Sequence, residues 1–151
     1  MKIFYFSLLV FVSLLFTACS STEETVIDSK GKICPECNMT LSKDSHKHSS
    51  YVKISGNINY FDDAGCMILW LKEKNINIQD INIQIFSNDS SQYIDAKQAF
   101  YAIDDITPMN YGFAAFEKNS KGLISFEQMR LKMLRGEHLA NPKIRKQILG
   151  N

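Results

Sequence analysis

The N-terminus of the chain constrains the fold most strongly, because a long apolar run there does not belong to the folded domain. Lys2 is followed by an almost wholly apolar stretch, residues 3–16, and then by Thr-Ala-Cys at 17–19. A basic start, an apolar run and small residues in this order are typical of an export signal. The run is short for a membrane-spanning helix, which needs about 20 apolar residues. We therefore predict that residues 1–18 are a signal peptide.

Cys19 stands directly after the predicted cleavage point. The letters LFTAC at residues 15–19 resemble the lipobox of bacterial lipoproteins, so we predict that Cys19 becomes the lipid-carrying first residue. Residues 19–32, which are mostly polar, would then tether the domain to a membrane of the cell envelope, facing the periplasm. An ordinary signal peptide cut near Ala18 is the alternative. Both interpretations place the domain outside the cytoplasm, where thiols can oxidise.

The cysteine count points to a free thiol. The chain has four cysteines, and a lipid on Cys19 leaves Cys34, Cys37 and Cys66. An odd number of cysteines cannot form a complete set of disulfides. A free thiol outside the cytoplasm calls for an explanation in redox chemistry or metal binding.

Composition excludes several classes of function. The chain has 151 residues, a formal net charge of +1 and 45% hydrophobic residues, which suits one compact unit or two small ones with a shared core. There is no basic stripe, so we predict no nucleic-acid binding. We find no catalytic triad, no paired acid and base carboxylates and no phosphate loop in the sequence, so we predict that the protein is not an enzyme.

The first half of the domain predicts a β-β-α-β order. Residues 51–56 alternate in polarity, and residues 57–61 follow as a hairpin partner across a turn at Gly56-Asn57. Asp62 or Asp63 is a suitable N-cap for a helix that runs to about residue 75. Isoleucines at alternate positions in residues 81–86 then indicate a half-buried strand.

The second half has a similar outline. We predict a strand in residues 91–103, a partner in 110–117 and a helix in 125–136, with Ser125 as N-cap and Gly136 as its end. The basic tail, residues 141–151, predicts a short helix that begins at Pro142. The expected fold is therefore α+β, with a domain at 33–140 made of two tandem ββαβ-like units, about 33–87 and 88–140, that share one core.

Soft metal donors are concentrated in one irregular, polar loop, residues 33–50. It contains Cys34, Cys37, Met39, His46 and His48, and Met109 comes later in the chain. Thiolates and thioethers select Cu(I), whereas zinc prefers thiolate and imidazole without thioether. Because Cu(I) accepts two or three ligands, a flexible loop can hold it and release it. Met39 therefore favours a Cu(I) site over other uses of the two cysteines.

Three other interpretations of the cysteine pair stay open. Cys34 and Cys37 could form a permanent disulfide in a structural module, or an oxidoreductase pair, although the pair follows a linker instead of opening a helix after a strand. They could also bind zinc together with His46 and His48. Cys66 and Met67, inside an apolar helix, fit a core better than a metal site.

Taken together, these motifs resemble the NosL family. The matching segments are CPECNM at 34–39, the stretch from His48 to Leu71 with its FDD motif, YIDAKQAFYAI at 93–103 and TPMNYGFAAFEK at 107–118. Members are lipid-anchored periplasmic copper proteins linked to the assembly of nitrous oxide reductase. The resemblance implies a fold of two small ββαβ units, as also seen in organomercurial lyase.

The resemblance also implies a set of metal ligands. By position, Cys37 and Met39 match the family's cysteine-methionine step, and Cys34 its upstream cysteine. Met109 and His48 match a later methionine and a histidine that some members carry. Asn38 and Asn110 stand where the family usually has glycine, and His46 and Cys66 receive no metal role. The implied function is a Cu(I) carrier that supplies apo nitrous oxide reductase, or its assembly machinery, with copper for the copper-sulfide centre.

Overall fold

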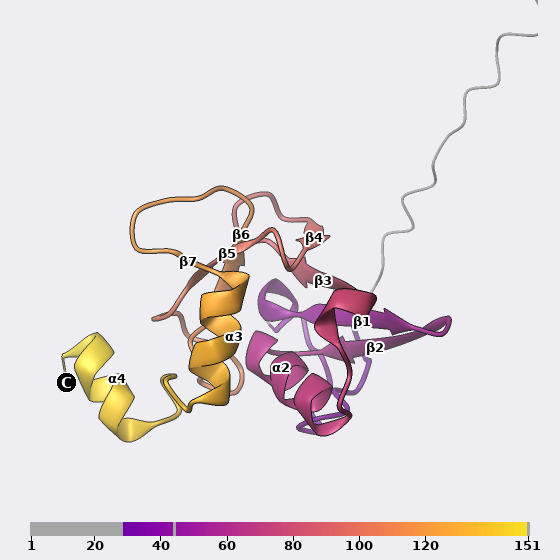
Figure 1. Ribbon diagram of the computed structural model, residues 1–151, viewed down its shortest axis with the longest axis horizontal. Coiled ribbons are helices and arrows are strands. Elements are labelled where there is room, and N and C mark those ends of the chain that lie inside the picture. The colour runs from indigo at the N-terminus through magenta and orange to yellow at the C-terminus, as the bar shows by residue number, and fades with distance from the viewer. Residues whose placement is uncertain (1–28, 44, 151) are drawn as a thin grey trace, which may run out of the picture.

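The computed structural model describes residues 29–43 and 45–150 (Figure 1). The predicted signal peptide, the predicted lipid site at Cys19 and most of the predicted linker lie outside these residues. Within them, no helix is long and apolar enough to cross a membrane. Residues 29–32, the end of the predicted linker, are tied to the domain, because the amide of Gly31 donates to the Leu41 carbonyl at 2.9 Å.

The first sheet has four antiparallel strands in the order β2-β1-β3-β4. They are β1 (Ser50–Ile54), β2 (Asn57–Phe61), β3 (Asn82–Phe86) and β4 (Tyr93–Asp95). The hairpin between β1 and β2 is confirmed, but its turn is Ser55-Gly56, with φ of 49° and 83°, one residue earlier than predicted. Asn57 is already paired with Ile54 in the sheet. Two successive positive φ angles suit the twist of a tight hairpin.

The second sheet has three antiparallel strands in the order β6-β5-β7. They are β5 (Phe100–Ala102), β6 (Ala114–Phe116) and β7 (Ile124–Ser125). The continuous strand predicted over 91–103 is wrong, because a turn at 96–99 divides it between the two sheets. The Tyr101 hydroxyl donates to the Ala96 carbonyl across that turn at 2.8 Å, and both residues are fully buried.

The helices begin and end close to the predicted residues. They are α2 (Ala64–Glu73), α3 (Phe126–Leu134) and α4 (Pro142–Leu149), with the 3₁₀ turns η1 (His46–His48) and η2 (Ile78–Asp80). Ser125 caps α3 through a capping box with Gln128, and Asn141 caps α4 with proline in its first turn. Gly136, at φ 72°, follows α3.

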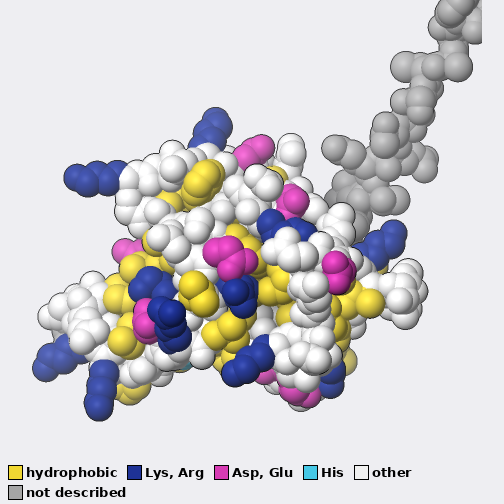
Figure 2. Space-filling model, viewed as in Figure 1, with side chains coloured by type: hydrophobic (Ala, Val, Ile, Leu, Met, Phe, Trp, Pro, Cys, Tyr) yellow, Lys and Arg dark blue, Asp and Glu magenta, His cyan; other side chains and the backbone are white. Residues whose placement is uncertain are grey.

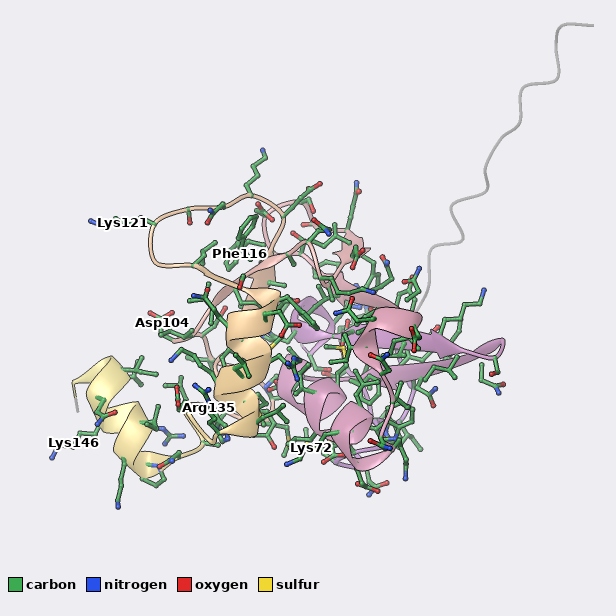
Figure 3. The ribbon with its side chains drawn as sticks, in the orientation of Figure 1. Lys72, Asp104, Phe116, Lys121, Arg135 and Lys146 are labelled. Atoms are coloured by element: carbon green, nitrogen blue, oxygen red, sulfur yellow. The ribbon has the colours of Figure 1, made fainter. Side chains whose placement is uncertain are left out.

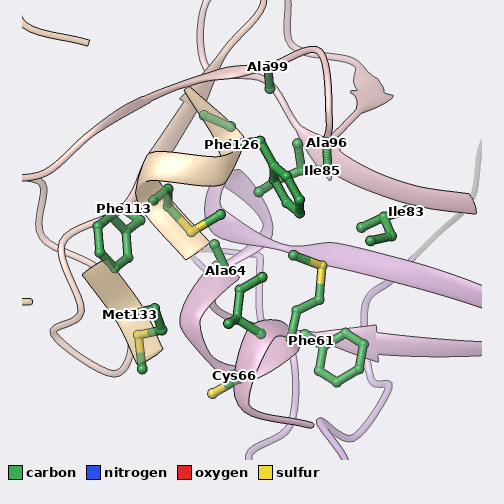
Figure 4. Packing of buried hydrophobic residues seen from close by; sticks show 14 of the residues in the cluster. Phe61, Ala64, Cys66, Ile83, Ile85, Ala96, Ala99, Phe113, Phe126 and Met133 are labelled. Carbon is green, nitrogen blue, oxygen red and sulfur yellow. The ribbon is translucent and has the colours of Figure 1, made fainter. Parts of the chain in front are cut away.

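One hydrophobic core joins the two sheets with α2 and α3 (Figures 1 and 4). Figure 4 shows Phe61 and Ala64 from the first half beside Phe113, Phe126 and Met133 from the second. The prediction of an α+β fold with a single core is confirmed. The first half follows the predicted order β-β-α-β. The second half does not repeat this order, because β4 pairs with β3 in the first sheet and is followed by β5, β6, β7 and α3.

The surface has a mixed character. Basic and acidic side chains are spread over the face seen in Figure 2, between small hydrophobic areas. Lys121, between β6 and β7, and Lys146, on α4, point away from the body of the protein (Figure 3). Helix α4 has no buried residue, so it contributes little to the core.

Candidate metal centre

The cysteine pair lies at the tip of a small irregular hairpin, residues 33–40. Ile33 and Thr40 form an isolated antiparallel bridge, and the amide of Cys34 donates to the Met39 carbonyl at 2.9 Å. The amide of Asn38 donates back to the Cys34 carbonyl at 2.9 Å, and Asn38 has φ 60°. Asparagine tolerates this left-handed conformation better than most residues. The tight turn therefore brings Cys34 and Cys37 to the same side of the hairpin.

The second half of the site is the start of α2. Asp63 caps the helix by accepting the amide of Gly65 at 2.9 Å. Asp62 therefore lies between the last residue of β2 and this cap, and Cys66 lies in the first turn of the helix. Asp62, Asp63 and Cys66 are all fully buried. Burial of two neighbouring carboxylates is costly unless they have partners, which marks this strand-to-helix junction as a candidate site.

Four donor atoms meet between the hairpin and the helix. They belong to Cys34, Cys37, Asp62 and Cys66, and all lie within 4.8 Å of one another. Cys34 and Cys66 are fully buried, and Cys37 is half-buried. Three thiols and one carboxylate at this spacing could hold a metal ion.

Hydrogen bonds prepare Cys34 as the thiolate of the cluster. The Cys66 thiol and the backbone amides of Glu36, Cys37 and Asp62 lower the pKa of Cys34 to about 7, against the opposing effect of burial. Burial, the Cys34 thiol and the Asp62 carboxylate raise the pKa of Cys37 to about 12. The pKa of Cys66 is also raised, first because it donates to Cys34 and then by burial. Of the three thiols, Cys34 therefore loses its proton most readily.

The Asp62 carboxylate has an unused oxygen inside the cluster. Its Oδ1 accepts from the Cys37 thiol at 3.3 Å. Its Oδ2 is buried and, among the described residues, has no hydrogen-bond partner. A buried carboxylate oxygen without a partner is unusual in a native protein. A metal ion at the centre of the cluster would supply the missing interaction.

Asp63 ties a long loop, residues 103–113, to the start of α2. Its Oδ2 accepts the amide of Met109 at 3.1 Å, and the Thr107 hydroxyl also hydrogen bonds to this carboxylate. Burial raises the pKa of Asp63 to about 6, although these hydrogen bonds oppose the shift. Asn110 has φ 55°, so Asn38 and Asn110 both adopt the left-handed conformation that glycine favours.

The predicted ligands occupy different places. Cys34 and Cys37 belong to the four-donor cluster. Met39 is 41% exposed on the hairpin, and Met109 is partly buried against the core beside Asp63. His48 is 3% exposed outside the cluster, and neither ring nitrogen has a hydrogen-bond partner within the described residues. Burial lowers the pKa of His48.

Cys66 and Asp62 were not singled out as ligands by the sequence. Cys66 looked like a core residue because Met67, Ile68 and Leu71 beside it are apolar, and those three are indeed buried. The odd number of thiols was the signal for Cys66 that the sequence analysis used. A second signal is its position three residues after the N-cap of α2, because the first turn of a helix lies close to the end of the preceding strand.

The structure bears on each of the alternatives for the cysteines, which are a disulfide, an oxidoreductase pair and a zinc site with histidines. The thiols of Cys34, Cys37 and Cys66 are free. The residues after Cys34 form a turn and not a helix, unlike the pair of a thioredoxin-like enzyme. His46 hydrogen bonds to Ser29 through Nδ1 at 2.8 Å and packs against Phe86 at 4.5 Å, outside the four-donor cluster.

Comparison of the chain with protein-family models, with curated proteins and with solved structures finds no match. The evidence for function therefore comes from the site itself and from the motifs of the sequence.

Proposed function

We propose that this protein is a periplasmic, lipid-anchored Cu(I) carrier that resembles the NosL family and supplies copper for the copper-sulfide centre of nitrous oxide reductase. The observation that supports it best is the meeting of Cys34, Cys37 and Cys66 in one buried site beside Asp62. The predicted export signal would put these thiols outside the cytoplasm, and all three are free thiols in the structure.

The donor set suits Cu(I) in several ways. Three thiols can give a three-coordinate sulfur site, and soft sulfur donors select Cu(I). Cys34 is already inclined to the thiolate form, so an arriving ion meets a charged ligand before the other two thiols lose protons. Cys37 is only half-buried, which leaves one ligand within reach of a partner protein for ligand exchange.

The resemblance adds the remaining parts of the proposal. Met39 and Met109 are proposed as further soft donors during loading or release, and His48 as a donor that some family members use. The positive φ of Asn38 and Asn110 supports the comparison with a family that has glycine at both positions. Apo nitrous oxide reductase or its assembly machinery is the proposed recipient, and no catalytic activity is proposed.

A zinc site is the second candidate, and Asp62 is the observation that favours it. Three thiolates and one carboxylate would complete a four-coordinate site of the kind that zinc prefers. A closed site of this kind would stabilise the fold and would not pass its ion on. The two candidates therefore differ in metal preference and in the rate of release.

A competition titration distinguishes the two candidates. The reduced domain starting at Ser20 would be titrated anaerobically with Cu(I) and with Zn(II) against chelators of known affinity. We expect one Cu(I) held more tightly than Zn(II). Cys37→Ala and Cys66→Ala should each weaken Cu(I) binding by more than the roughly 10–100-fold that loss of a supporting residue costs.

Met39→Ala and Ile33→Ala form a matched pair for the thioether. Both residues are exposed on the same hairpin, at 41% and 63%, but only Met39 carries a sulfur. We expect weaker Cu(I) binding in the methionine variant alone. Unchanged Cu(I) affinity in both cysteine variants, or stronger binding of Zn(II) than of Cu(I), would overturn the proposal.

Transfer is tested by mixing Cu(I)-loaded protein with apo nitrous oxide reductase and separating the two proteins. We expect copper to move to the enzyme, and to move more slowly from the Met39→Ala variant. Copper that stays on the loaded protein would restrict the proposal to copper storage.

A further inference from the structure

The ring of Tyr111 rests directly on the first turn of α2. A Cβ added at Gly65 would lie 2.7 Å from Cγ and 2.8 Å from Cε2 of this ring, closer than real Cβ atoms come. The ring of Tyr111 therefore occupies the space that a side chain at position 65 would need.

Tyr111 also lies among the charged groups of both halves of the metal centre. Burial raises the pKa of its hydroxyl to about 12, and the groups that raise it further are Cys66 and Asp63 on the helix side, followed by Glu36 and Cys37 on the hairpin side. Gly65, against which the ring of Tyr111 lies, directly precedes Cys66 of the four-donor cluster. The ring is half-buried, whereas Cys34 and Cys66 beneath this junction are fully buried.

The backbone on both sides of Tyr111 is anchored. Met109 donates to Asp63, and the Gly112 amide donates to the Thr107 hydroxyl at 3.2 Å. The Tyr111 carbonyl accepts the amide of Leu139 at 3.2 Å. The ring itself packs between Gly65 and His138, whose ring centroid is 4.8 Å away. The backbone is thus anchored, so a change of the Tyr111 rotamer would move the ring without refolding the loop.

We propose that Tyr111 is a movable cover of the metal centre, which closes the cluster when its ring sits on Gly65 and must turn away before a reagent or an ion reaches Cys34 and Cys66. The effect on thiol access rests on this geometry alone. The effect on copper exchange rests on the proposed function as well. Tyr111 is thus proposed to set the rate of exchange, and the thiols to set the affinity.

Thiol alkylation tests the cover without any metal. The full chain, reduced, metal-free and in detergent, would be treated with iodoacetamide, and Cys34 and Cys66 followed by peptide mass spectrometry. We expect Tyr111→Ala to speed both reactions at least about tenfold, which corresponds to a barrier lower by about 1.4 kcal/mol. Gly65→Ala should have the same effect, because it displaces the ring without removing it.

Two controls separate a cover from a general loss of stability. Tyr111→Phe keeps the ring and should react like the wild type. Tyr93→Ala removes a half-buried tyrosine that packs against Phe86, away from the cluster, and should leave both rates within about twofold. Unchanged rates in Tyr111→Ala, or an equal increase in Tyr93→Ala, would overturn the proposal.

Copper exchange gives a second, separate readout. We expect Cu(I) to leave Tyr111→Ala for a chelator at least about tenfold faster, with a much smaller change in the equilibrium constant, since loading is faster as well. A tenfold loss of affinity with no faster loading would identify Tyr111 as a ligand-positioning residue and overturn its role as a cover. If the wild type binds no Cu(I), the proposed function fails while the alkylation result still decides the cover.

Discussion

The two halves of the metal centre are built in different ways. On the helix side, residues 61–68 are buried without interruption, and Asp62 and Cys66 are held by the core and by the Asp63 cap. On the hairpin side, residues 38–40 are exposed, and the shape depends on a few backbone hydrogen bonds. The helix side is therefore held by the core, whereas the hairpin side is held mainly by its own backbone hydrogen bonds.

This difference assigns separate tasks to the cysteines. Cys66 is a fixed thiol that donates to Cys34, and Cys37 is a half-buried thiol on the less supported side. A carrier needs one part of the site that keeps its geometry and another that yields to a partner. Four measurements test this difference between the helix side and the hairpin side.

The largest effect is expected from Asp63, which holds the helix side together. Asp63→Ala leaves the amides of Gly65 and Met109 buried without their acceptor, and each such loss costs about 1–3 kcal/mol. We expect the metal-free protein to lose about 3 kcal/mol of unfolding free energy in urea denaturation at pH 7.5. Asp63→Asn keeps an acceptor oxygen and should lose about 1 kcal/mol or less.

Asp89 is the matched control for that experiment. Its carboxylate also accepts backbone amides, from Glu117 and Lys118, but the residue is exposed and far from the site. We expect Asp89→Ala to have a clearly smaller effect than Asp63→Ala. Equal losses in the two variants would contradict a helix side that depends on burial of Asp63.

The second prediction concerns pH. The pKa of Asp63 is about 6 in the folded protein, above the ordinary value of 3.8, so the folded state binds more protons between these values. The contribution of Asp63 to stability is therefore greatest below pH 4 and falls by up to about 3 kcal/mol as the pH rises to 6. His48 and His138 have lowered pKa values and act in the opposite direction.

The measurement must separate the contribution of Asp63 to the pH dependence of stability from the contributions of His48 and His138. Urea denaturation of the metal-free protein from pH 4 to pH 7 should be compared with the same series for Asp63→Asn. We expect the difference in unfolding free energy between the wild type and Asp63→Asn to change by about 2–3 kcal/mol over this pH range. Asp89 does not interfere, because hydrogen bonds lower its pKa to about 2, below this range. Parallel curves would mean that Asp63 titrates normally.

The sequence predicted the turns, helix caps and strands around the site better than it predicted the residues that form the site. Local rules were sufficient for the β1–β2 hairpin, for a cap of α2 at Asp62 or Asp63 and for the Ser125 cap of α3, because turn and capping residues act on their own neighbours. The structure assigns the first cap to Asp63 and adds Gln128 to the second. Local rules were not sufficient for the break at residues 96–99, because two different sheets compete for the flanking strands. Alternating polarity alone cannot reveal that competition.

The same reasoning explains the ligands. Cys34 and Cys37 were predictable because they lie three residues apart in one loop. Asp62 and Cys66 join them only through the packing of the hairpin against α2, a contact between residues 25 or more positions apart. The apolar residues around Cys66 predict correctly that it is buried, but they do not predict which residues its sulfur contacts.

The third prediction compares the two kinds of thiol in the metal-free protein. Cys66→Ala removes a fully buried sulfur and its hydrogen bond to Cys34, so we expect a loss of about 1–2 kcal/mol. Cys37→Ala removes a half-buried sulfur from the hairpin, and we expect less than about 0.5 kcal/mol. Urea denaturation of both variants, with excess chelator, measures the difference. A larger loss of unfolding free energy for Cys37→Ala than for Cys66→Ala would mean that the hairpin side is the more rigid of the two.

The smallest effect is expected from His46, which tests whether the cluster is complete without imidazole. The ring of His46 packs against Phe86 and Tyr93, and its Nδ1 hydrogen bonds to Ser29. These contacts hold it on the side of β3 and β4, outside the four donors. We therefore expect His46→Ala to change the affinity for Cu(I) or Zn(II) by less than about twofold, roughly 0.4 kcal/mol, in the chelator titration. Cys37→Ala serves as the positive control in the same assay. A tenfold weaker affinity for Zn(II) in His46→Ala would mean that the hairpin side rearranges around the ion far enough to recruit this histidine.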